Sequence, residues 1–172
     1  MDTNMRQQPE YLITRHRVRA MLFDRQPWNP EWDCGFCSSL ILDLADSSCP
    51  HCGGRSEPIC VDLTYDVSDP YAFTFEFHPN TRRTVKWIWG RDMLREGLVR
   101  PAGVGDIQLR PHRSNTDVTV LRVESPDGRA VFHFNRDDLV DWVDEIFELV
   151  PEGTEKIDWD SELDLLAPDR RR

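Results

Sequence analysis

Hydrophobic and polar residues alternate with a period of two along much of the chain, and this alternation is typical of half-buried β-strands. Two of these stretches are rich in aromatic residues: Phe73, Phe75 and Phe77 share one face, and so do Trp87 and Trp89. Segments rich in proline, glycine, asparagine and aspartate separate the alternating stretches and favour turns. The pattern predicts strands at residues 12–23, 59–64, 73–77, 85–89, 107–110, 118–123 and 130–134.

Helical periodicity is found in three places, two of them after the last predicted strand. A short helix is expected at residues 90–96, with Gly97 placed to cap its C-terminus. Asn135 is a good N-cap for a longer helix, whose apolar residues recur on one face and which Pro151 ends. Residues 158–166 are expected to form a last helix. Strands combined with helices in this order predict an α+β fold.

Two Cys-x-x-Cys pairs are the most specific chemical signal in the sequence. They are Cys34 with Cys37 and Cys49 with Cys52, and eleven residues separate one pair from the other. The two-residue spacing lets a tight turn direct two sulfurs at one point, and four thiolates form the tetrahedron that zinc prefers. Four cysteine ligands leave no open coordination position, so we predict one structural zinc ion.

Other interpretations of the four cysteines stay open at this stage. Two separate redox motifs or a pair of disulfides would use the same residues. Iron in a rubredoxin-like setting is the rival metal, although eleven residues between the pairs are few for that architecture. A reducing cytoplasm favours metal over disulfides. His51 lies inside the second turn, and we expect it to be exposed because four cysteines already complete the coordination.

The cysteine turns lie within an excursion of residues 24–58 that interrupts the strand pattern. A metal ion would stabilise this segment, which is too short to bury a core unaided. Trp28, Trp32 and Phe36 lie beside the first cysteines. Aromatic residues in exposed loops are enriched in binding hot spots, so these three are candidate partner-binding residues. They could equally wrap the metal turns.

The length and the apolar content indicate one globular domain. The chain has 172 residues, of which 39% are hydrophobic and 30% charged. It begins with a polar segment unlike a signal peptide, and no stretch approaches the roughly 20 apolar residues that span a bilayer. We therefore expect a cytoplasmic protein. Its single domain comprises residues 12–23 and 59–167, with 24–58 inserted and a basic tail at 168–172.

The formal net charge of −10 argues against broad nucleic-acid binding, which needs a basic surface. The charge is uneven, because arginines gather in residues 81–113 while acidic residues dominate after Asp137. This asymmetry could steer self-association or partner docking, or it could represent two ordinary solvated faces.

Motifs of the common enzyme classes are missing from the sequence. It contains no Gly-x-Ser-x-Gly elbow, no phosphate-binding loop and no His-Glu-x-x-His motif. The histidines are scattered, and Cys60 is expected to be a small buried or partly exposed thiol. We expect a protein that is not an enzyme.

A series of short motifs from Ile59 onward carries a family resemblance. The motifs occupy residues 69–72, 85–89, 91–94, 96–98, 101–106, 111–114, 125–128 and 150–155. In this order they resemble the SsgA-like proteins, an actinobacterial family of sporulation and cell-division proteins, and residues 12–23 look like the family's first strand. The resemblance covers roughly two thirds of the chain.

The resemblance implies a strongly bent antiparallel sheet with packed helices, similar to the whirly single-stranded nucleic-acid binders. It implies a non-catalytic protein of septum placement and spore-wall assembly that forms homo-oligomers, trimers or dimers. Some family members bring the tubulin-like division protein FtsZ to the septum. The family usually joins its first two strands by a short loop, so the insertion is a departure, as is Lys86, where an acidic residue is expected.

Two functions follow as hypotheses. The first is a cytoplasmic adaptor for the cell-division machinery at septa, with the zinc module docking an additional partner. The second is a nucleic-acid-binding transcriptional regulator that uses the whirly-like sheet or the zinc turns. Base stacking would then require exposed aromatic rings beside a basic groove, which Trp87, Trp89 and the arginines of 81–113 would supply. The acidic net charge favours the first hypothesis.

Overall fold

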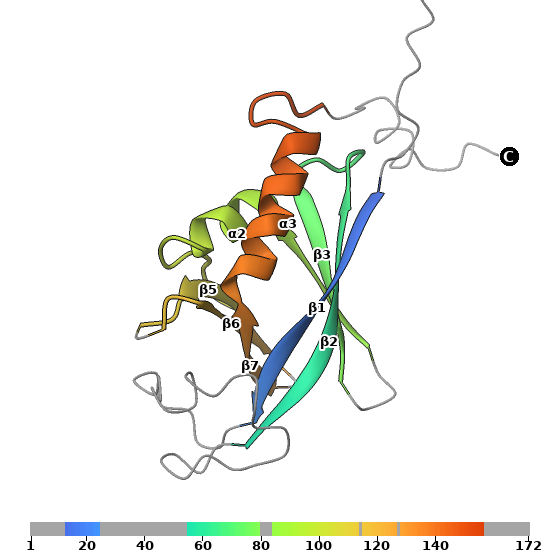
Figure 1. The fold of residues 1–172 in the computed structure, drawn as a ribbon. Coiled ribbons are helices and arrows are strands. Elements are labelled where there is room, and N and C mark those ends of the chain that lie inside the picture. The colour runs from blue at the N-terminus through green and yellow to red at the C-terminus, as the bar shows by residue number, and fades with distance from the viewer. Residues whose placement is uncertain (1–12, 25–54, 80–83, 114, 127, 157–172) are drawn as a thin grey trace, which may run out of the picture.

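The computed structural model describes residues 13–24, 55–79, 84–113, 115–126 and 128–156 (Figure 1). In this part of the chain a single curled sheet packs against two helices. The strands are β1 (Ile13–Asp24), β2 (Arg55–Asp66), β3 (Ala72–His78), β4 (Val85–Gly90), β5 (Ile107–Pro111), β6 (Val118–Ser125) and β7 (Gly128–Asn135). The helices are α2 (Arg91–Gly97) and α3 (Arg136–Leu149).

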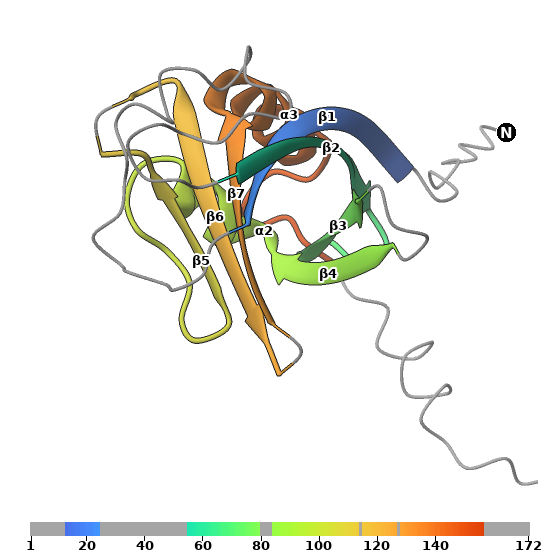
Figure 2. The same ribbon diagram turned by 90° about the horizontal axis from the view of Figure 1, so that it is seen from below.

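The described strands form one antiparallel sheet in the order β4-β3-β2-β1-β7-β6-β5. β1 and β2 pair along their whole length, whereas β1 meets β7 only from Ala20 to Phe23. The first part of β1 therefore diverges from β7, and the strands curl rather than lie flat (Figure 2). This confirms the predicted bent antiparallel sheet and the α+β class.

The core lies on the concave face of this sheet, where α3 packs. The phenylalanines of β3 alternate with partly exposed residues, and Phe73, Phe75 and Phe77 are all buried. Trp142 of α3 reaches them, with its ring 5.3 Å from Phe73 and 6.0 Å from Phe75, centroid to centroid. Burying rings of this size contributes roughly 1.5–3 kcal/mol each. The aromatic strand predicted from the sequence is therefore the centre of the core.

Helix α3 begins and packs as the sequence predicts. The Asn135 side chain accepts a hydrogen bond from the Asp137 amide at 2.8 Å, which satisfies one of the free donors of the first turn. Leu139, Trp142, Val143 and Ile146 are buried on one face. Val150 is only partly buried and follows the helix in an extended conformation.

Gly97 differs from its prediction. It was expected to cap the C-terminus of α2, but it is the last helical residue, its φ is not positive, and Leu98 occupies the cap with φ −73°. A Cβ at Gly97 would lie 2.5 Å from Cδ2 of Leu109 in β5. The physical reason for a glycine here is therefore the close approach of helix and strand, not the cap geometry.

The long strands extend further than predicted at one end of the sheet. β1 runs to Asp24 and β2 starts at Arg55, and these two residues are directly opposite each other. The sheet therefore includes Asp24 and residues 55–58 of the predicted excursion 24–58. The predicted last helix at 158–166 and the basic tail at 168–172 lie outside the described residues.

Candidate protein-interaction site

The residues predicted to bind metal and partner fall outside the described part of the chain. These are Cys34, Cys37, Cys49 and Cys52 for zinc, and Trp28, Trp32 and Phe36 for a partner. Among the described residues, no group of three or more histidine, cysteine, aspartate or glutamate side chains is placed to hold a metal ion. Cys60, the one cysteine that is described, is exposed on the convex face of β2. The zinc site stays a prediction.

An apolar groove of about 260 Å³ lies at the end of the sheet where the strand pair β1 and β2 opens toward residues 25–54. Alternate residues of a strand share a face, so the inward side chains of neighbouring strands meet along this groove. Its lining comprises Leu22, Ile59, Phe77, Pro79, Val85, Trp87, Val123, Ser125, Gly128, Arg129, Ala130 and Phe132.

Phe77 and Phe132 join the two walls of the groove. Their rings stack with centroids 4.4 Å apart, and both side chains are buried. Val85 and Trp87 of β4 line the groove with Phe77, while Ala130 of β7 lines it with Phe132. Trp142 of α3 contacts Phe73, further along the concave face. Figure 1 shows both described helices away from the end of the sheet where β1 ends and β2 begins.

The groove can accept an apolar side chain from another molecule. Val85 is 46% exposed and Trp87 is partly exposed, so apolar surface at this end is open to solvent. Arg129 supplies positive charge to the lining, and its guanidinium lies 2.6 Å from a Glu124 carboxylate oxygen. Apolar pockets with few polar groups at their rim bind the aromatic or aliphatic anchors of partner proteins.

A second, polar hollow of about 450 Å³ lies where β1 diverges from β7 and the start of α3. Its walls carry opposite charges, with Arg17 and Arg19 on β1 and Asp138 and Asp141 on α3. Burial raises the pKa of Asp138, and the negative charges of Asp141 and Asp137 raise it further. His133 also lines this hollow, and its ring lies 5.7 Å from that of buried His112.

Charged residues on the convex face of β1 to β4 are largely paired with one another. The Asp62 carboxylate accepts two hydrogen bonds from Arg17, at 2.6 and 2.8 Å, and lies 2.9 Å from Nε2 of His78. The hydrogen bond from Arg17 is the main cause that lowers the pKa of Asp62 to about 2. Lys86 lies 3.5 Å from Glu76.

The aromatic rings proposed for base stacking lie on the other face of the sheet. Trp89 is buried in the core with 4% exposure, and Trp87 lines the apolar groove. Their strand neighbour Lys86 points to the convex face, because successive residues of a strand alternate. Among the described residues, Trp87 and Trp89 therefore do not form an exposed stacking platform beside a basic groove.

Arg91 is a buried residue that the sequence interpretation did not single out. It is the first residue of α2 and only 1% exposed. Its guanidinium donates to the Tyr65 hydroxyl at 3.2 Å and to the Val150 carbonyl at 2.6 Å, and it forms an ion pair with Glu155. It also lies over the Phe147 ring, 4.4 Å from the centroid.

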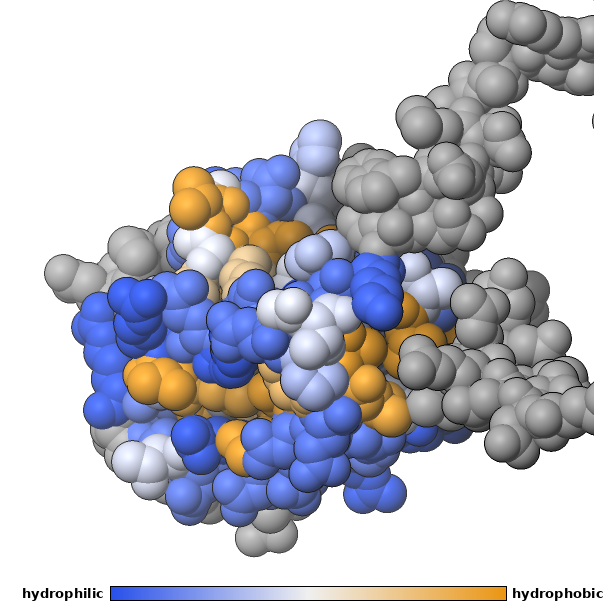
Figure 3. Space-filling view, turned by 90° about the horizontal axis from the view of Figure 1, so that it is seen from above, coloured by the Kyte–Doolittle hydropathy of each residue, from blue (hydrophilic) through white to orange (hydrophobic). Residues whose placement is uncertain are grey.

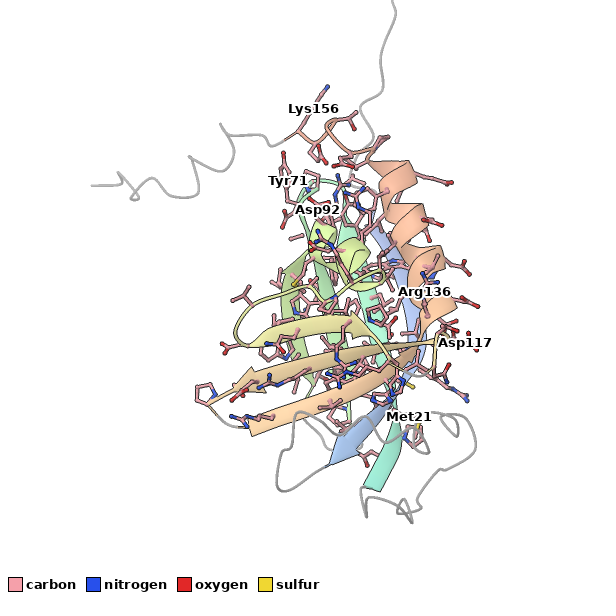
Figure 4. The ribbon with its side chains drawn as sticks, turned by 90° about the vertical axis from the view of Figure 1, so that its left-hand side faces the viewer. Met21, Tyr71, Asp92, Asp117, Arg136 and Lys156 are labelled. Carbon is pink, nitrogen blue, oxygen red and sulfur yellow. The ribbon has the colours of Figure 1, made fainter. Side chains whose placement is uncertain are left out.

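These contacts of Arg91 fix the Val150–Lys156 segment, named here the C-terminal loop, against the sheet. Figure 4 shows Tyr71, Asp92 and Lys156 together at this end of the molecule. Figure 3 views the same end and shows hydrophilic side chains around strips of apolar surface. One feature of the sequence indicated a structural role for Arg91. It precedes the apolar residue Leu94 by three positions, and residues three apart share one face of a helix.

The described part of the chain is a small α+β scaffold, in which a curled antiparallel sheet packs against two helices and leaves an apolar groove at one end. None of its described helices has the length and hydropathy needed to traverse a bilayer. The model of the family described as "Streptomyces sporulation and cell division protein, SsgA" matches residues 59–155. The chain belongs to the SsgA family, which confirms the resemblance noted in the sequence.

Relatives in this family are similar along most of their length. The sporulation-specific cell division protein SsgB of Saccharopolyspora erythraea is 35% identical over 120 residues, which is 70% of this chain and 82% of that protein. SsgB of Streptomyces coelicolor is 37% identical over 111 residues, which is 64% of this chain and 81% of that protein.

Two solved structures have a similar fold. One, an SsgA-like sporulation-specific cell division protein from Thermobifida fusca, has a TM-score of 0.64 at 26% identity and covers 91% of this chain and 96% of its own. The other was reported with mutations in SsgB that correlate to longitudinal cell division during sporulation of Streptomyces coelicolor. It has a TM-score of 0.62 at 27% identity and covers 84% of this chain and 94% of its own.

Proposed function

We propose that this protein is a non-catalytic adaptor of sporulation-type cell division that acts at the septum through protein–protein contacts. The relatives named as sporulation-specific cell division proteins support the process. The observation that carries the mode of action is the open apolar groove at the end of the curled sheet. Partner anchors inserted into such grooves dominate many interfaces.

The division machinery supplies the proposed partner, with the tubulin-like protein FtsZ as the first candidate because the family resemblance implies it. An apolar or aromatic side chain of FtsZ would enter between Val85 and Ala130, on the opposite walls of the groove. The adaptor would also associate with itself, which would present several grooves at one septum and raise the effective concentration of the partner.

The four cysteines would hold a structural zinc ion in the insertion and shape a docking surface for an additional partner. Their spacing fits the ligand pattern of a tetrahedral site with four cysteine ligands. Asp24 and Arg55 support an inserted module, since these flanking residues are directly opposite each other and a separate unit can leave and re-enter the sheet there. Trp28, Trp32 and Phe36 would then serve as anchors beside the metal turns.

Metal analysis of purified protein tests the zinc proposal, because the chain contains its own control. Cys34→Ser and Cys49→Ser each remove one predicted ligand, while Cys60→Ser removes the exposed thiol of β2. We expect one zinc ion per chain in the wild type and in the Cys60→Ser variant, and a large loss in the other two. Wild-type protein without zinc, or equal zinc in all variants, would refute the site.

Co-purification with FtsZ and the other division proteins tests the adaptor role. A variant in which a short turn replaces residues 25–54 keeps the β1–β2 pair, because Asp24 and Arg55 are neighbours across the strands. We expect it to retain FtsZ through the groove and to lose at least one other protein. Identical protein sets would argue against docking by the insertion, and no division protein with either form would argue against the adaptor.

The second candidate, a nucleic-acid-binding regulator, is favoured by the similarity to whirly proteins that the resemblance implies. The inward orientation of Trp87 and Trp89 and the ion pairs on the convex face count against it. A titration with single-stranded DNA at low and high salt separates the two functions, since phosphate contacts weaken steeply as salt rises. Tight, salt-dependent binding would favour the regulator over the adaptor.

A further inference from the structure

Strand β1 leaves the rest of the sheet beside the start of α3. It pairs with β2 along its whole length, but with β7 only from Ala20 to Phe23. The polar hollow of about 450 Å³ lies where the two strands part, and residues 16–21 of β1 all line it. The backbone of β1 therefore forms one wall of this hollow.

The hydrogen-bond pattern determines which backbone groups of β1 lie along this wall. The Arg136 amide donates to the Asp117 carbonyl at 2.8 Å, directly beyond the last β6–β7 pair. Hydrogen-bonded and non-hydrogen-bonded pairs alternate in an antiparallel ladder, so His133 of β7 bonds to Met21 of β1 rather than to β6. The odd-numbered residues of β1 therefore direct their amides and carbonyls away from β2.

Arg15 and Arg17 are odd-numbered residues that lie beyond the pairs of β1 with β7. In the part of the chain that the structure describes, no backbone group bonds to their amides or carbonyls. A continued β7 would cover this edge, but the chain turns into α3 at Arg136 instead. An uncovered strand edge is a template for another extended segment.

The convex side of this edge is basic. Arg15, Arg17 and Arg19 are all exposed there, because alternate residues of a strand share a face. A residue of an added strand points to the same face as the residue directly opposite it. Opposite charges stabilise such cross-strand pairs, so acidic side chains are favoured opposite these arginines.

The concave side of the same edge is acidic. Asp138, Asp141 and Glu145 recur at i, i+3 and i+7 along α3, so they share one flank of the helix. Asp138 and Asp141 line the hollow, and the Glu145 carboxylate lies 2.6 Å from Nε2 of His16, so this flank faces β1. The intervening residues of an added strand would point toward these carboxylates, which favours lysine or arginine at those positions.

We propose that the hollow binds an extended segment of a protein partner, which adds to β1 as a new strand opposite residues 15–19. Its side chains alternate between acidic residues on the convex face and basic residues toward α3. At a rise of about 3.4 Å per residue, a segment of about five residues spans this edge. In this mode of recognition the backbone hydrogen bonds supply affinity and the side chains supply specificity. The hollow shares no lining residue with the apolar groove, so the proposal goes beyond the function stated above.

Other occupants fit this edge less well. A second copy of β1, paired antiparallel around Arg17, would place arginines opposite arginines, and like charges destabilise a cross-strand pair. A single-stranded nucleic acid would bring its phosphates toward Asp138 and Asp141. An alternating peptide avoids both conflicts.

Fluorescence anisotropy with the full chain and the labelled peptide Thr-Glu-Lys-Glu-Lys-Glu-Thr tests the charge pattern. Its glutamates would lie opposite Arg15, Arg17 and Arg19, and its lysines would point toward α3. The control peptide Thr-Glu-Glu-Glu-Lys-Lys-Thr has the same composition without the alternation. We expect the control to bind about tenfold or more weakly than the alternating peptide.

N-methylated forms of the alternating peptide test the backbone pairing. Methylation of the glutamate amides removes the donors that would bond to β1, whereas methylation of the lysine amides changes groups that point away from it. We expect the first form to lose about tenfold or more in affinity and the second to lose less than about threefold.

Charge reversals in the chain locate the site. Arg19→Glu changes a residue that lines the hollow, while Arg100→Glu is the matched control, since Arg100 is 73% exposed and lies outside the hollow. We expect Arg19→Glu to weaken binding of the alternating peptide about fivefold or more and Arg100→Glu to leave it unchanged. Val85→Asp, in the apolar groove, should also leave it unchanged, so that failure of this proposal can be told from failure of the groove. Thermal unfolding checks that each variant folds.

Hydrogen exchange of backbone amides measures the edge directly. In the full chain alone, the amides of Arg15 and Arg17 should exchange fast, while those of His16 and Val18, which point to β2, should be protected. The alternating peptide should protect the first two amides as well.

Four results would overturn the proposal. The first is protection of Arg15 and Arg17 without the peptide, because another part of the chain or a second copy would then already occupy the edge. The second is no binding of the alternating peptide at about 1 mM. The others are equal affinity for the alternating and control peptides, and equal effects of Arg19→Glu and Arg100→Glu.

Discussion

The Arg91 guanidinium donates to the Val150 carbonyl at 2.6 Å and so ties the start of α2 to the chain directly after α3. Both groups lie at the end of the molecule opposite the apolar groove, beside the Tyr65 hydroxyl and Glu155. The hydrogen bonds to backbone amides lower the pKa of Glu155, and the positive charge of Arg91 lowers it further. One buried cation therefore organises the C-terminal loop.

Removing this cation should destabilise the fold. Arg91→Met keeps much of the side-chain volume but removes the guanidinium donor of the Val150 carbonyl and the ion-pair partner of Glu155. We expect a loss of about 2–3 kcal/mol in the free energy of unfolding. Chemical denaturation measures it. Arg95→Met is the matched control, because Arg95 is 42% exposed and also lies over Phe147, 4.3 Å from its centroid. If both variants lost a similar amount of unfolding free energy, the burial of Arg91 would not explain the destabilisation.

Gly97 should be more sensitive to a methyl group than its helical position suggests. Gly97→Ala would bring Cβ within 2.5 Å of Leu109 in β5, and we expect a loss of about 1–3 kcal/mol from overpacking. Gly90→Ala is the matched control, since the nearest atom to its Cβ would be the Tyr71 carbonyl oxygen at 3.9 Å. Thermal unfolding compares the two. A neutral Gly97→Ala would mean that α2 and β5 separate easily.

The Asp62 ion pair should contribute stability that depends on pH. Its pKa falls from 3.8 to about 2 in the folded protein, chiefly because Arg17 donates to the carboxylate. The folded state therefore favours the charged form, so the contribution is complete above about pH 4 and is lost as the pH falls toward 2.

Asp62→Asn should be less stable than the wild type at pH 7, and the difference should shrink between about pH 4 and pH 2. Denaturation across this range measures it. In an Arg17→Met background the same substitution should show little of this pH dependence, because the main cause of the pKa shift is gone. If the stability difference between the wild type and Asp62→Asn stayed constant from pH 7 to pH 2, the Asp62 ion pair would not be the source of the pH dependence.

The sheet could be predicted from the sequence because its strands bury one face only. Alternation in Phe73 to Phe77 and the Ser125–Gly128 turn determined strand positions to within a few residues. The N-cap and apolar face of α3 were as clear, since Asn135 and the spacing of Trp142 and Ile146 are local signals.

The groove and the buried arginine could not be predicted in the same way. The groove depends on how far the sheet curls, which brings Phe77 and Phe132 into contact across strands that are distant in sequence. Arg91 is buried only because the C-terminal loop returns over it, a contact between residues 59 positions apart. The contacts that form the groove and those that bury Arg91 join residues far apart in the sequence. A short stretch of sequence therefore contains no periodic signal for either of them.

The groove is the central claim of this account, and direct binding of purified FtsZ tests it. Val85→Asp and Ala130→Asp place a charge on opposite walls, while Val104→Asp changes a residue that is 94% exposed and lies outside the groove. Biolayer interferometry should show affinity lowered about tenfold or more by the first two substitutions and unchanged by the third. Equal affinity for all four proteins, wild type included, would contradict the account.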